Sequence, residues 1–230
     1  MEIEDAGQVI LVNCSNIEVK NLNLSNTDVG IELLNSKNCR IESNIISNNG
    51  YGIELWYSSS NIITNNVISN SEWDGIWLGG SSNNIITSNN ISYNENSGIW
   101  LNENSGIWLD ESWGNTITKN NIDNNERGIF LCGSFGNRIT QNNIDNNEEG
   151  IFLWYSFGNR ITKNNFIRNF IQATFGNSFF NWWFNNYWDD WRWKFSLPRP
   201  IKGTICLEFI DRDIPWINFD WHPSTEPLEG

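Results

Sequence analysis

Apolar residues along the chain fall in short alternating runs that are separated by Ser, Asn and Gly. One run reads Gly-Ile, any residue, then Leu, and it recurs in steps of 22, 23, 23, 8, 22 and 22 residues. Its glycines are Gly30, Gly52, Gly75, Gly98, Gly106, Gly128 and Gly150. A second run, Ile-x-x-Asn-x-Ile, follows at a fixed offset, as at Ile41, Ile63 and Ile86. Alternation of period two over three or four residues predicts β-strands rather than helices.

A unit of this length cannot bury its own apolar side, whereas stacked units can place equivalent residues above one another at about 4.8 Å. The sequence therefore predicts an all-β fold, a right-handed parallel β-helix with one unit per coil. Seven coils are expected from Val9 to Asn169, and an eighth from Ile171 to Phe184. Residues 1–188 form the predicted solenoid, and residues 189–230 form an aromatic tail that packs on it or caps it.

Most of the 41 asparagines follow from this architecture. The Asn of the second run forms a predicted buried column, in which each amide bonds to backbone and to the Asn of the next coil. Its members are Asn44, Asn66, Asn89, Asn120, Asn142 and Asn164. A second Asn column is predicted at Asn26, Asn48, Asn70, Asn124 and Asn146, and a Ser column marks another turn. Segment 98–105 nearly duplicates segment 106–113, and because eight residues are too few for a coil, one copy is predicted to bulge outward as an insertion near 98–105.

Charge and composition exclude several classes of protein. The formal net charge is −13 over 230 residues, so a nucleic-acid partner is not expected because nothing would neutralise its phosphates. No apolar stretch reaches the length of a membrane span, and the acidic start has no signal-peptide core. The four cysteines are scattered and show no metal-binding spacing.

The repeats between Val9 and Trp191 resemble the PbH1 repeats of NosD-like and carbohydrate-binding or sugar-hydrolase β-helix proteins. The Trp-rich tail, with the segments 185–191 and 214–223, resembles the ends of secreted archaeal NosD-like proteins. The resemblance implies an extracellular or cell-surface protein, often without demonstrated activity. NosD itself serves the maturation of a copper enzyme, but this chain has one His and one Met, which departs from a copper carrier.

The outward position between the inward Ile and Leu of the first run becomes aromatic in the later coils. Exposed aromatic faces at regular spacing suit the C–H faces of sugar rings. The predicted carbohydrate-binding residues are Trp77, Trp100, Trp108, Phe130 and Phe152, with Trp56 and Trp154 close by. In the competing interpretation, which we favour slightly over an open sugar platform, the aromatic tail folds back to cover this stripe or caps the last coil.

Two groups of carboxylates are candidates for chemistry. Glu32 and Glu54 occupy the same outward column on adjacent coils, near the spacing of a retaining glycosidase pair, although a solvated pair is the simpler explanation. The second group stacks on neighbouring coils, and Ca²⁺ would relieve its repulsion unless Arg127 does so. Its members are Asp123, Glu126, Asp145 and Glu148. No other cofactor is expected.

Three functions stay open at this point. The first is a non-catalytic exported or cell-surface module, structural or carbohydrate-binding, with a polysaccharide or surface glycan as its partner. The second is a polysaccharide-modifying enzyme of the hydrolase or lyase type that uses Glu32 and Glu54. The third is a self-assembling or accessory protein. No capping helix is evident at the N-terminal end, so the third function predicts end-to-end association or further upstream coils.

Overall fold

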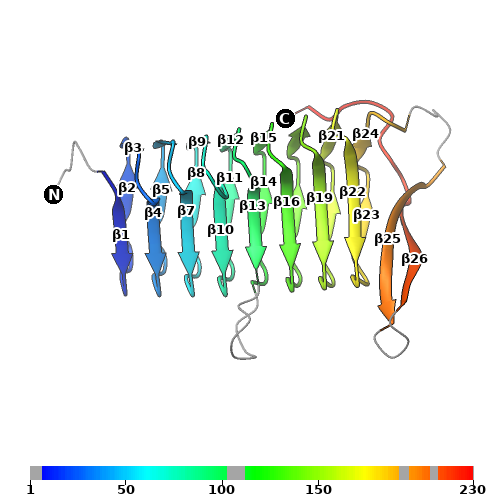
Figure 1. Cartoon of the computed structure of the whole chain (residues 1–230), viewed down its shortest axis with the longest axis horizontal. Coiled ribbons are helices and arrows are strands. Elements are labelled where there is room, and N and C mark those ends of the chain that lie inside the picture. The colour runs from blue at the N-terminus through cyan, green and yellow to red at the C-terminus, as the bar shows by residue number, and fades with distance from the viewer. Residues whose placement is uncertain (1–6, 103–111, 192–196, 208–211, 230) are drawn as a thin grey trace.

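The computed structural model describes residues 7–102, 112–191, 197–207 and 212–229, and these form a parallel β-helix of eight coils (Figure 1). Each coil contributes three strands. The first strands are β1 (Val9–Val12), β4 (Val29–Leu34), β7 (Tyr51–Trp56), β10 (Ile76–Gly79), β13 (Ser97–Asn102), β16 (Arg127–Cys132), β19 (Glu149–Trp154) and β22 (Ile171–Gly176). The eighth coil, predicted from the sequence, is therefore present.

The other two strands of each coil are short. The second strands are β2 (Glu18–Lys20), β5 (Arg40–Glu42), β8 (Ile62–Thr64), β11 (Ile85–Thr87), β14 (Thr116–Thr118), β17 (Arg138–Thr140), β20 (Arg160–Thr162) and β23 (Trp182–Phe184). The third strands are β3 (Asn23–Ser25), β6 (Ile45–Ser47), β9 (Val67–Ser69), β12 (Asn90–Ser92), β15 (Asn121–Asp123), β18 (Asn143–Asp145), β21 (Asn165–Ile167) and β24 (Tyr187–Trp188). Among the described residues, no helix is long and apolar enough to cross a membrane.

Residues one period apart lie directly above one another, as the repeat predicts. Ile63 pairs with Ile86 and then Ile86 with Ile117, all in parallel register. The inward Ile and Leu side chains of successive coils are fully buried and form one continuous aliphatic core. At the C-terminal end the core side chains become larger, with Phe166 stacked on Trp188 at 4.2 Å between ring centroids. The period of the apolar pattern thus fixes both the strands and their register.

The Gly of the Gly-Ile pair is required by close packing between coils. A Cβ placed on Gly52 would lie 2.3 Å from the carbonyl oxygen of Gly75 and 2.5 Å from a methyl of Ile68. No side chain fits at that position without moving backbone. The glycine that marks each repeat in the sequence therefore marks the place where one coil touches the next.

The predicted buried Asn column exists and carries a continuous hydrogen-bond ladder. The Oδ1 of Asn89 accepts from the backbone N–H of Asn66 at 2.9 Å and from its Nδ2 at 3.0 Å. The Nδ2 of Asn89 donates to the carbonyl of Ile63 and to Asn120, both at 3.0 Å. Every polar atom of the amide is thus paired inside the protein, which explains why the position requires Asn.

Two further ladders were not predicted. One contains Asn61, Asn84, Asn115, Asn137, Asn159 and Asn181. The other runs from the backbone N–H of Ser71 through Asn94, Asn125, Asn147 and Asn169, and Asn49 occupies the equivalent position one coil earlier, where it accepts from Thr27. The column predicted at Asn26, Asn48, Asn70, Asn124 and Asn146 lies at turn residues with positive φ of 54° to 60°. Asn serves there because its side chain tolerates the left-handed conformation.

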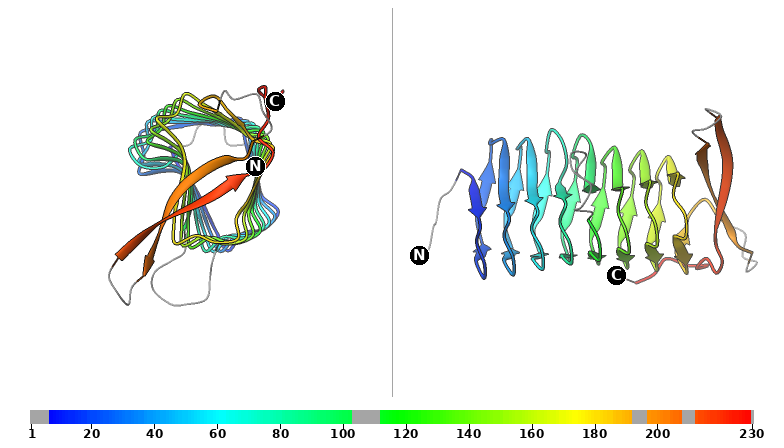
Figure 2. Two further views of the ribbon diagram at one scale, coloured as in Figure 1. Left: turned by 90° about the vertical axis from the view of Figure 1, so that its right-hand side faces the viewer. Right: turned by 90° about the horizontal axis from the view of Figure 1, so that it is seen from below.

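A C-terminal hairpin lies across the last coil (Figure 2). It consists of β25 (Arg199–Leu207) and β26 (Arg212–Asp220), which pair antiparallel. Strand β25 continues the ladder of β22, and Asp220 pairs with Trp183 of β23. Asp220 is fully buried, and one carboxylate oxygen accepts from the N–H and Nδ2 of Asn186 and from the indole N–H of Trp188 at 2.9 to 3.0 Å. The carboxylate therefore ends the central Asn ladder.

Residues after the hairpin run back beside the third strands. Ser224 bridges to Tyr187, and Leu228 exchanges two backbone hydrogen bonds with the amide of Asn165, at 2.8 and 2.9 Å. These contacts place the described tail residues over the end of the solenoid and along β24 and β21, rather than along the aromatic stripe.

Candidate functional site

The outward residues of β4 to β19 form one surface, here called the acidic–aromatic face. Its central column follows the register Glu32, Glu54, Trp77, Trp100, Phe130 and Phe152, one residue from each of six coils. A second column lies beside it at the N-terminal ends of the same strands, and it contains Tyr51, Asp74, Ser97, Arg127 and Glu149. Flat parallel strands hold both columns in line, so the face changes from acidic to aromatic along the solenoid axis.

Glu32 and Glu54 pair across adjacent strands, as the sequence predicts. Burial raises the pKa of Glu54 above its usual value, the negative charge of Glu32 raises it further, and a hydrogen bond from Trp56 opposes both effects. The catalytic role of this pair stays a prediction.

Asp74 is a buried carboxylate that the sequence analysis missed. Its side chain is 0% exposed, and one oxygen accepts the backbone N–H of Ser97 at 2.8 Å. Its other oxygen, Oδ2, has no hydrogen-bond partner among the described residues. Burial raises the pKa of Asp74 to about 7; bonds from Ser97 and the charge of Arg127 oppose this shift, and the charge of Glu54 adds to it. A carboxyl of this kind gains and loses its proton near neutral pH.

The burial of Asp74 follows from one extra residue at the corner that precedes its strand. Asn49 stands three residues before Gly52, whereas the equivalent Ser71 stands four residues before Gly75. A corner of the same length, with Asn94 four residues before Gly98, accounts for the second 23-residue step, and the extra residue before Gly75 accounts for the first. This extra residue turns Trp73 outward, where its ring stacks on Tyr51 at 6.4 Å, and it turns Asp74 inward. The change of period was thus the signal in the sequence that pointed to this site.

Trp77 is not the exposed ring that the sequence predicts. It is only 6% exposed because Trp56 packs against it, with 4.1 Å between the ring centroids. Its ring also lies over Gly79, where a Cβ would come within 2.3 Å of it. The small residue two positions along the strand lets the indole lie flat on the sheet. Trp77 therefore forms the floor of the face rather than an open platform.

Phe130 and Phe152 stack on one another, with 5.1 Å between centroids and 9° between planes. The guanidinium of Arg127 lies 5.3 Å and 5.8 Å from the two ring centroids. The ring faces are thus turned largely toward each other and toward Arg127, in a cation–π arrangement. Both rings are half-buried, and their binding of sugars stays a prediction.

The most accessible ring among the predicted sugar-binding residues with a described side chain is Trp154, which is 38% exposed. It lies over Gly176 of the next coil and meets Tyr155 edge-on, with 5.1 Å between centroids. Trp56 is half-buried beside the exposed Tyr57 at the equivalent turn of the third coil. The backbone of Trp100 lies in register between Trp77 and Phe130, and Trp108 falls outside the described residues.

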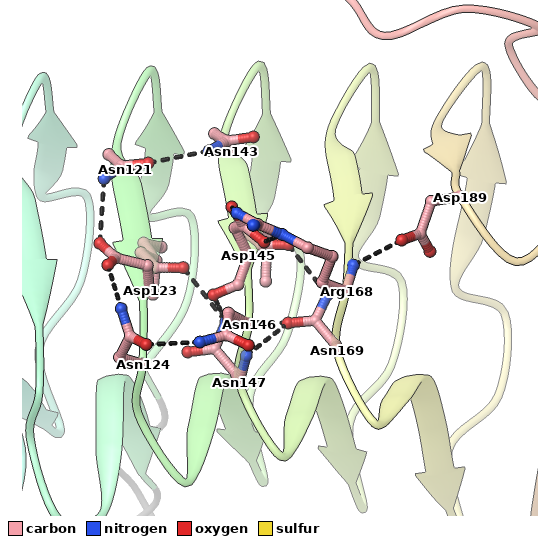
Figure 3. Close-up of polar contacts among 12 residues, drawn as sticks. Asn121, Asp123, Asn124, Asn143, Asp145, Asn146, Asn147, Arg168, Asn169 and Asp189 are labelled. Atoms are coloured by element: carbon pink, nitrogen blue, oxygen red, sulfur yellow. Dashed lines mark hydrogen bonds and ion pairs between the residues drawn. The ribbon is translucent and has the colours of Figure 1, made fainter.

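The carboxylates considered for Ca²⁺ lie on two sides of one corner. Asp123 and Asp145 pair across β15 and β18 as predicted, and Arg168 binds both oxygens of Asp145 (Figure 3). Asp123 accepts from the amide of Asn121 at 3.0 Å. Burial raises the pKa of Asp123, and the charge of Asp145 raises it further. An arginine from the next coil therefore supplies the positive charge at this corner.

Glu126 and Glu148 are exposed at the same corner, and the first of them forms an ion pair with Arg127 at 3.3 Å. Arg127 also lies 3.5 Å from Glu149, whose pKa is raised by burial and lowered in part by a hydrogen bond from Thr174. In the part of the chain that the structure describes, no three acidic, His or Cys side chains are grouped to hold a metal ion. Ca²⁺ binding through Asp123, Glu126, Asp145 and Glu148 stays untested.

The chain is similar in structure to epimerases of mannuronan or alginate and to a tailspike protein. The A-module of a mannuronan C-5 epimerase from Azotobacter vinelandii has a TM-score of 0.69 at 13% identity, covering 83% of this chain and 52% of that one. A periplasmic alginate epimerase gives 0.60 at 22%, covering 86% and 40%. The Dettilon tailspike protein gives 0.59 at 19%, covering 73% and 41%. At these identities the similarity establishes the fold alone.

The chain spans about half the length of these solved structures or less. No curated protein matches the sequence. The family model described as "Right handed beta helix region" matches residues 8–167, which include the first seven coils and every residue of the two columns on the acidic–aromatic face. The repeat, the parallel register and this match together show that the chain belongs to the right-handed β-helix family.

Proposed function

We propose that this protein is an exported or cell-surface β-helix that binds a polysaccharide along its acidic–aromatic face. The observation that carries the proposal is that acidic, basic and aromatic side chains gather on one face of a long, flat stack of strands. Carboxylates and Arg127 supply hydrogen bonds to hydroxyl groups, and Trp56 and Trp154 supply apolar contact at the edge. Extended chains of sugars match the linear shape of such a face.

The comparisons support this proposal at the level of ligand class. Two of the solved structures are named as epimerases of mannuronan or alginate, and another is a phage tailspike protein. The periplasmic description of one of them also agrees with an exported location. The NosD-like resemblance of the repeats points in the same direction.

Replacing Trp154 with alanine is expected to weaken polysaccharide binding about fivefold, because an exposed aromatic contact contributes about 1 kcal/mol. The measurement is affinity electrophoresis through gels containing alginate, pectin or a neutral glucan. Tyr93→Ala is the matched control, since Tyr93 is an exposed aromatic at a turn on another side of the coil. Equal retardation of both variants and the unchanged protein would exclude the face as the binding surface.

A second candidate function is catalysis on the bound polysaccharide, and the specific observation in its favour is Asp74. Asp74 is buried away from the surface, but a carboxyl with a pKa of about 7 changes the charge beside Glu54 near neutral pH, and Glu54 is the group that would act on the substrate. Glu54 and Tyr51 lie close enough for their electrostatic interaction with Asp74 to shift pKa values. Burial and the charges of Asp74 and Glu54 raise the pKa of Tyr51, so its phenol stays protonated.

If the face is catalytic, Glu54→Gln is expected to lower turnover by a factor of about 10² to 10⁴ without abolishing binding. Products from a panel of polysaccharides, separated by chromatography, provide the measurement. Glu72→Gln is the control, because Glu72 is an exposed carboxylate at the neighbouring corner. Binding without turnover by the unchanged protein would favour the non-catalytic function.

A further inference from the structure

A second surface, formed by the outward residues of β17, β20 and β23, contains a groove of about 390 Å³. Its lining residues are Arg138, Arg160, Thr162, Trp182 and Phe184, which together are here called the basic groove. The two arginines are exposed and adjacent in register, and Trp182 is the next residue of the same column. None of these residues belongs to the acidic–aromatic face.

Arg138 and Arg160 belong to the column formed by the first residue of each second strand, and the third residue of each second strand forms the column beside it. In the first coils the charges of these two columns neutralise one another. Lys20 pairs with Glu18 at 2.9 Å, and Arg40 pairs with Glu42 at 2.6 Å. At the basic groove the residues facing the arginines are instead Thr140, Thr162 and Phe184, none of which carries a charge. Within the described ranges, no carboxylate lies at ion-pair distance from Arg138 or Arg160. Two cations on adjacent rungs, about 4.8 Å apart, repel one another unless an anion lies between them.

The aromatic wall of the groove is open. The indole of Trp182 is 64% exposed, which is a large apolar surface to leave in water. Phe184 is supported from behind by the ring of His222, with 5.0 Å between centroids. A forked pair of guanidinium groups beside a flat ring matches a pyranose that carries an anionic substituent, because arginine binds oxyanions in a bidentate manner and the indole contacts the sugar's C–H face.

We propose that the basic groove binds an acidic saccharide, with its carboxylate or sulfate between Arg138 and Arg160 and its ring on Trp182. This site is separate from the acidic–aromatic face, and the proposal for the basic groove does not depend on the proposed function of that face. The net charge of −13 repels a uniformly charged polyanion, so the ligand expected is a mostly neutral glycan with isolated anionic sugars. The same charge disfavours a nucleic acid.

Calorimetric titration of the full chain tests this site with four probes. These are glucuronosyl-xylobiose, which carries one carboxylate, neocarrabiose monosulfate, neutral xylotriose and a short single-stranded oligonucleotide. We expect one or both anionic saccharides to bind at least tenfold more tightly than xylotriose. Affinity should fall between about 0.01 M and about 1 M salt, over which the screening length shrinks from about 30 Å to about 3 Å. The two anionic probes distinguish carboxylated from sulfated ligands.

Three variants locate the site. Arg138→Gln/Arg160→Gln is expected to reduce this affinity at least tenfold, and Trp182→Ala about tenfold. Arg40→Gln is the matched control, because Arg40 lies in the same column but is already paired with Glu42, and it should bind as the unchanged protein does. All replaced side chains lie outside the core, and thermal melting checks the fold.

Several results would overturn the proposal. They are equal binding by the double variant and Arg40→Gln, equal binding of xylotriose, tighter binding of the oligonucleotide, or no binding of either anionic saccharide at millimolar concentration. Loss of binding in Trp154→Ala with the basic groove variants unaffected would assign the ligand to the acidic–aromatic face instead. The first four results leave the test of that face unchanged.

Discussion

Asp74→Asn is expected to raise the free energy of unfolding at pH 8 by up to about 4 kcal/mol relative to the unchanged protein. The pKa of Asp74 rises from 3.8 to about 7 on folding, and this difference of about three pH units corresponds to that energy. Asparagine keeps an oxygen for the N–H of Ser97 and carries no charge to bury. The cost of ionising a buried carboxyl is thereby removed.

The sign of the effect depends on pH. Because the pKa is raised in the folded state, the folded protein holds the proton between about pH 4 and pH 7, and its stability falls as pH rises through this range. The two proteins should therefore be equally stable near pH 4 and differ most above pH 7. Urea unfolding at five pH values measures this, with Asp28→Asn as the control at an exposed carboxylate in the first coil's equivalent corner. A difference that is constant with pH would contradict the assignment.

Asn89→Ala is expected to reduce the free energy of unfolding by about 3 to 5 kcal/mol. The change removes the partner of the N–H of Asn66, one of the two hydrogen bonds of its Nδ2, and the side-chain bond to the carbonyl of Ile63. Each buried polar group that loses its hydrogen bond costs about 1 to 3 kcal/mol. Urea unfolding followed by circular dichroism provides the measurement.

Asn90→Ala is the matched control for the ladder. Asn90 is the neighbouring residue, its side chain is exposed on β12, and it accepts one hydrogen bond from Asn121 at 3.0 Å. Water replaces that bond readily, so the change should cost less than about 0.5 kcal/mol. Equal losses in the two variants would mean that the amide ladder does not stabilise the fold.

The sequence predicts the coils well because its strongest signals are the ones that position the backbone. Ile63 and Ile86 recur at the period of one turn, and burial at both positions follows from that recurrence alone. The Asn column at Asn66 and Asn89 is predictable for the same reason, since a buried amide must find partners at the same height in the next coil. The local pattern and the global register agree at every one of these positions.

The candidate site is less predictable from the sequence because it depends on side-chain conformations and on how neighbouring side chains pack. Trp77 becomes buried only because Trp56 and Gly79 let its ring lie flat, which no column of outward positions reveals. Asp74 is buried by one added corner residue. The sequence shows the repeat spacing of 23 residues, but the spacing alone does not reveal that the corner buries a carboxylate. Arg168 binds Asp145 from the following coil, 23 residues later in the sequence. The sequence offers Asp145 several possible partners at such a separation, so this salt bridge could not be predicted.

The corner insertion at Trp73 has a consequence for how such a chain can change over time. A residue gained within a strand would reverse the faces of everything that follows it in that strand. The added residue at this corner instead leaves Ile76 in register with Ile53 and the central Asn ladder unbroken. Gene duplication by whole periods of 22 or 23 residues likewise preserves every column. New side chains can therefore be acquired at the corners during evolution without any change in the stacking of the strands.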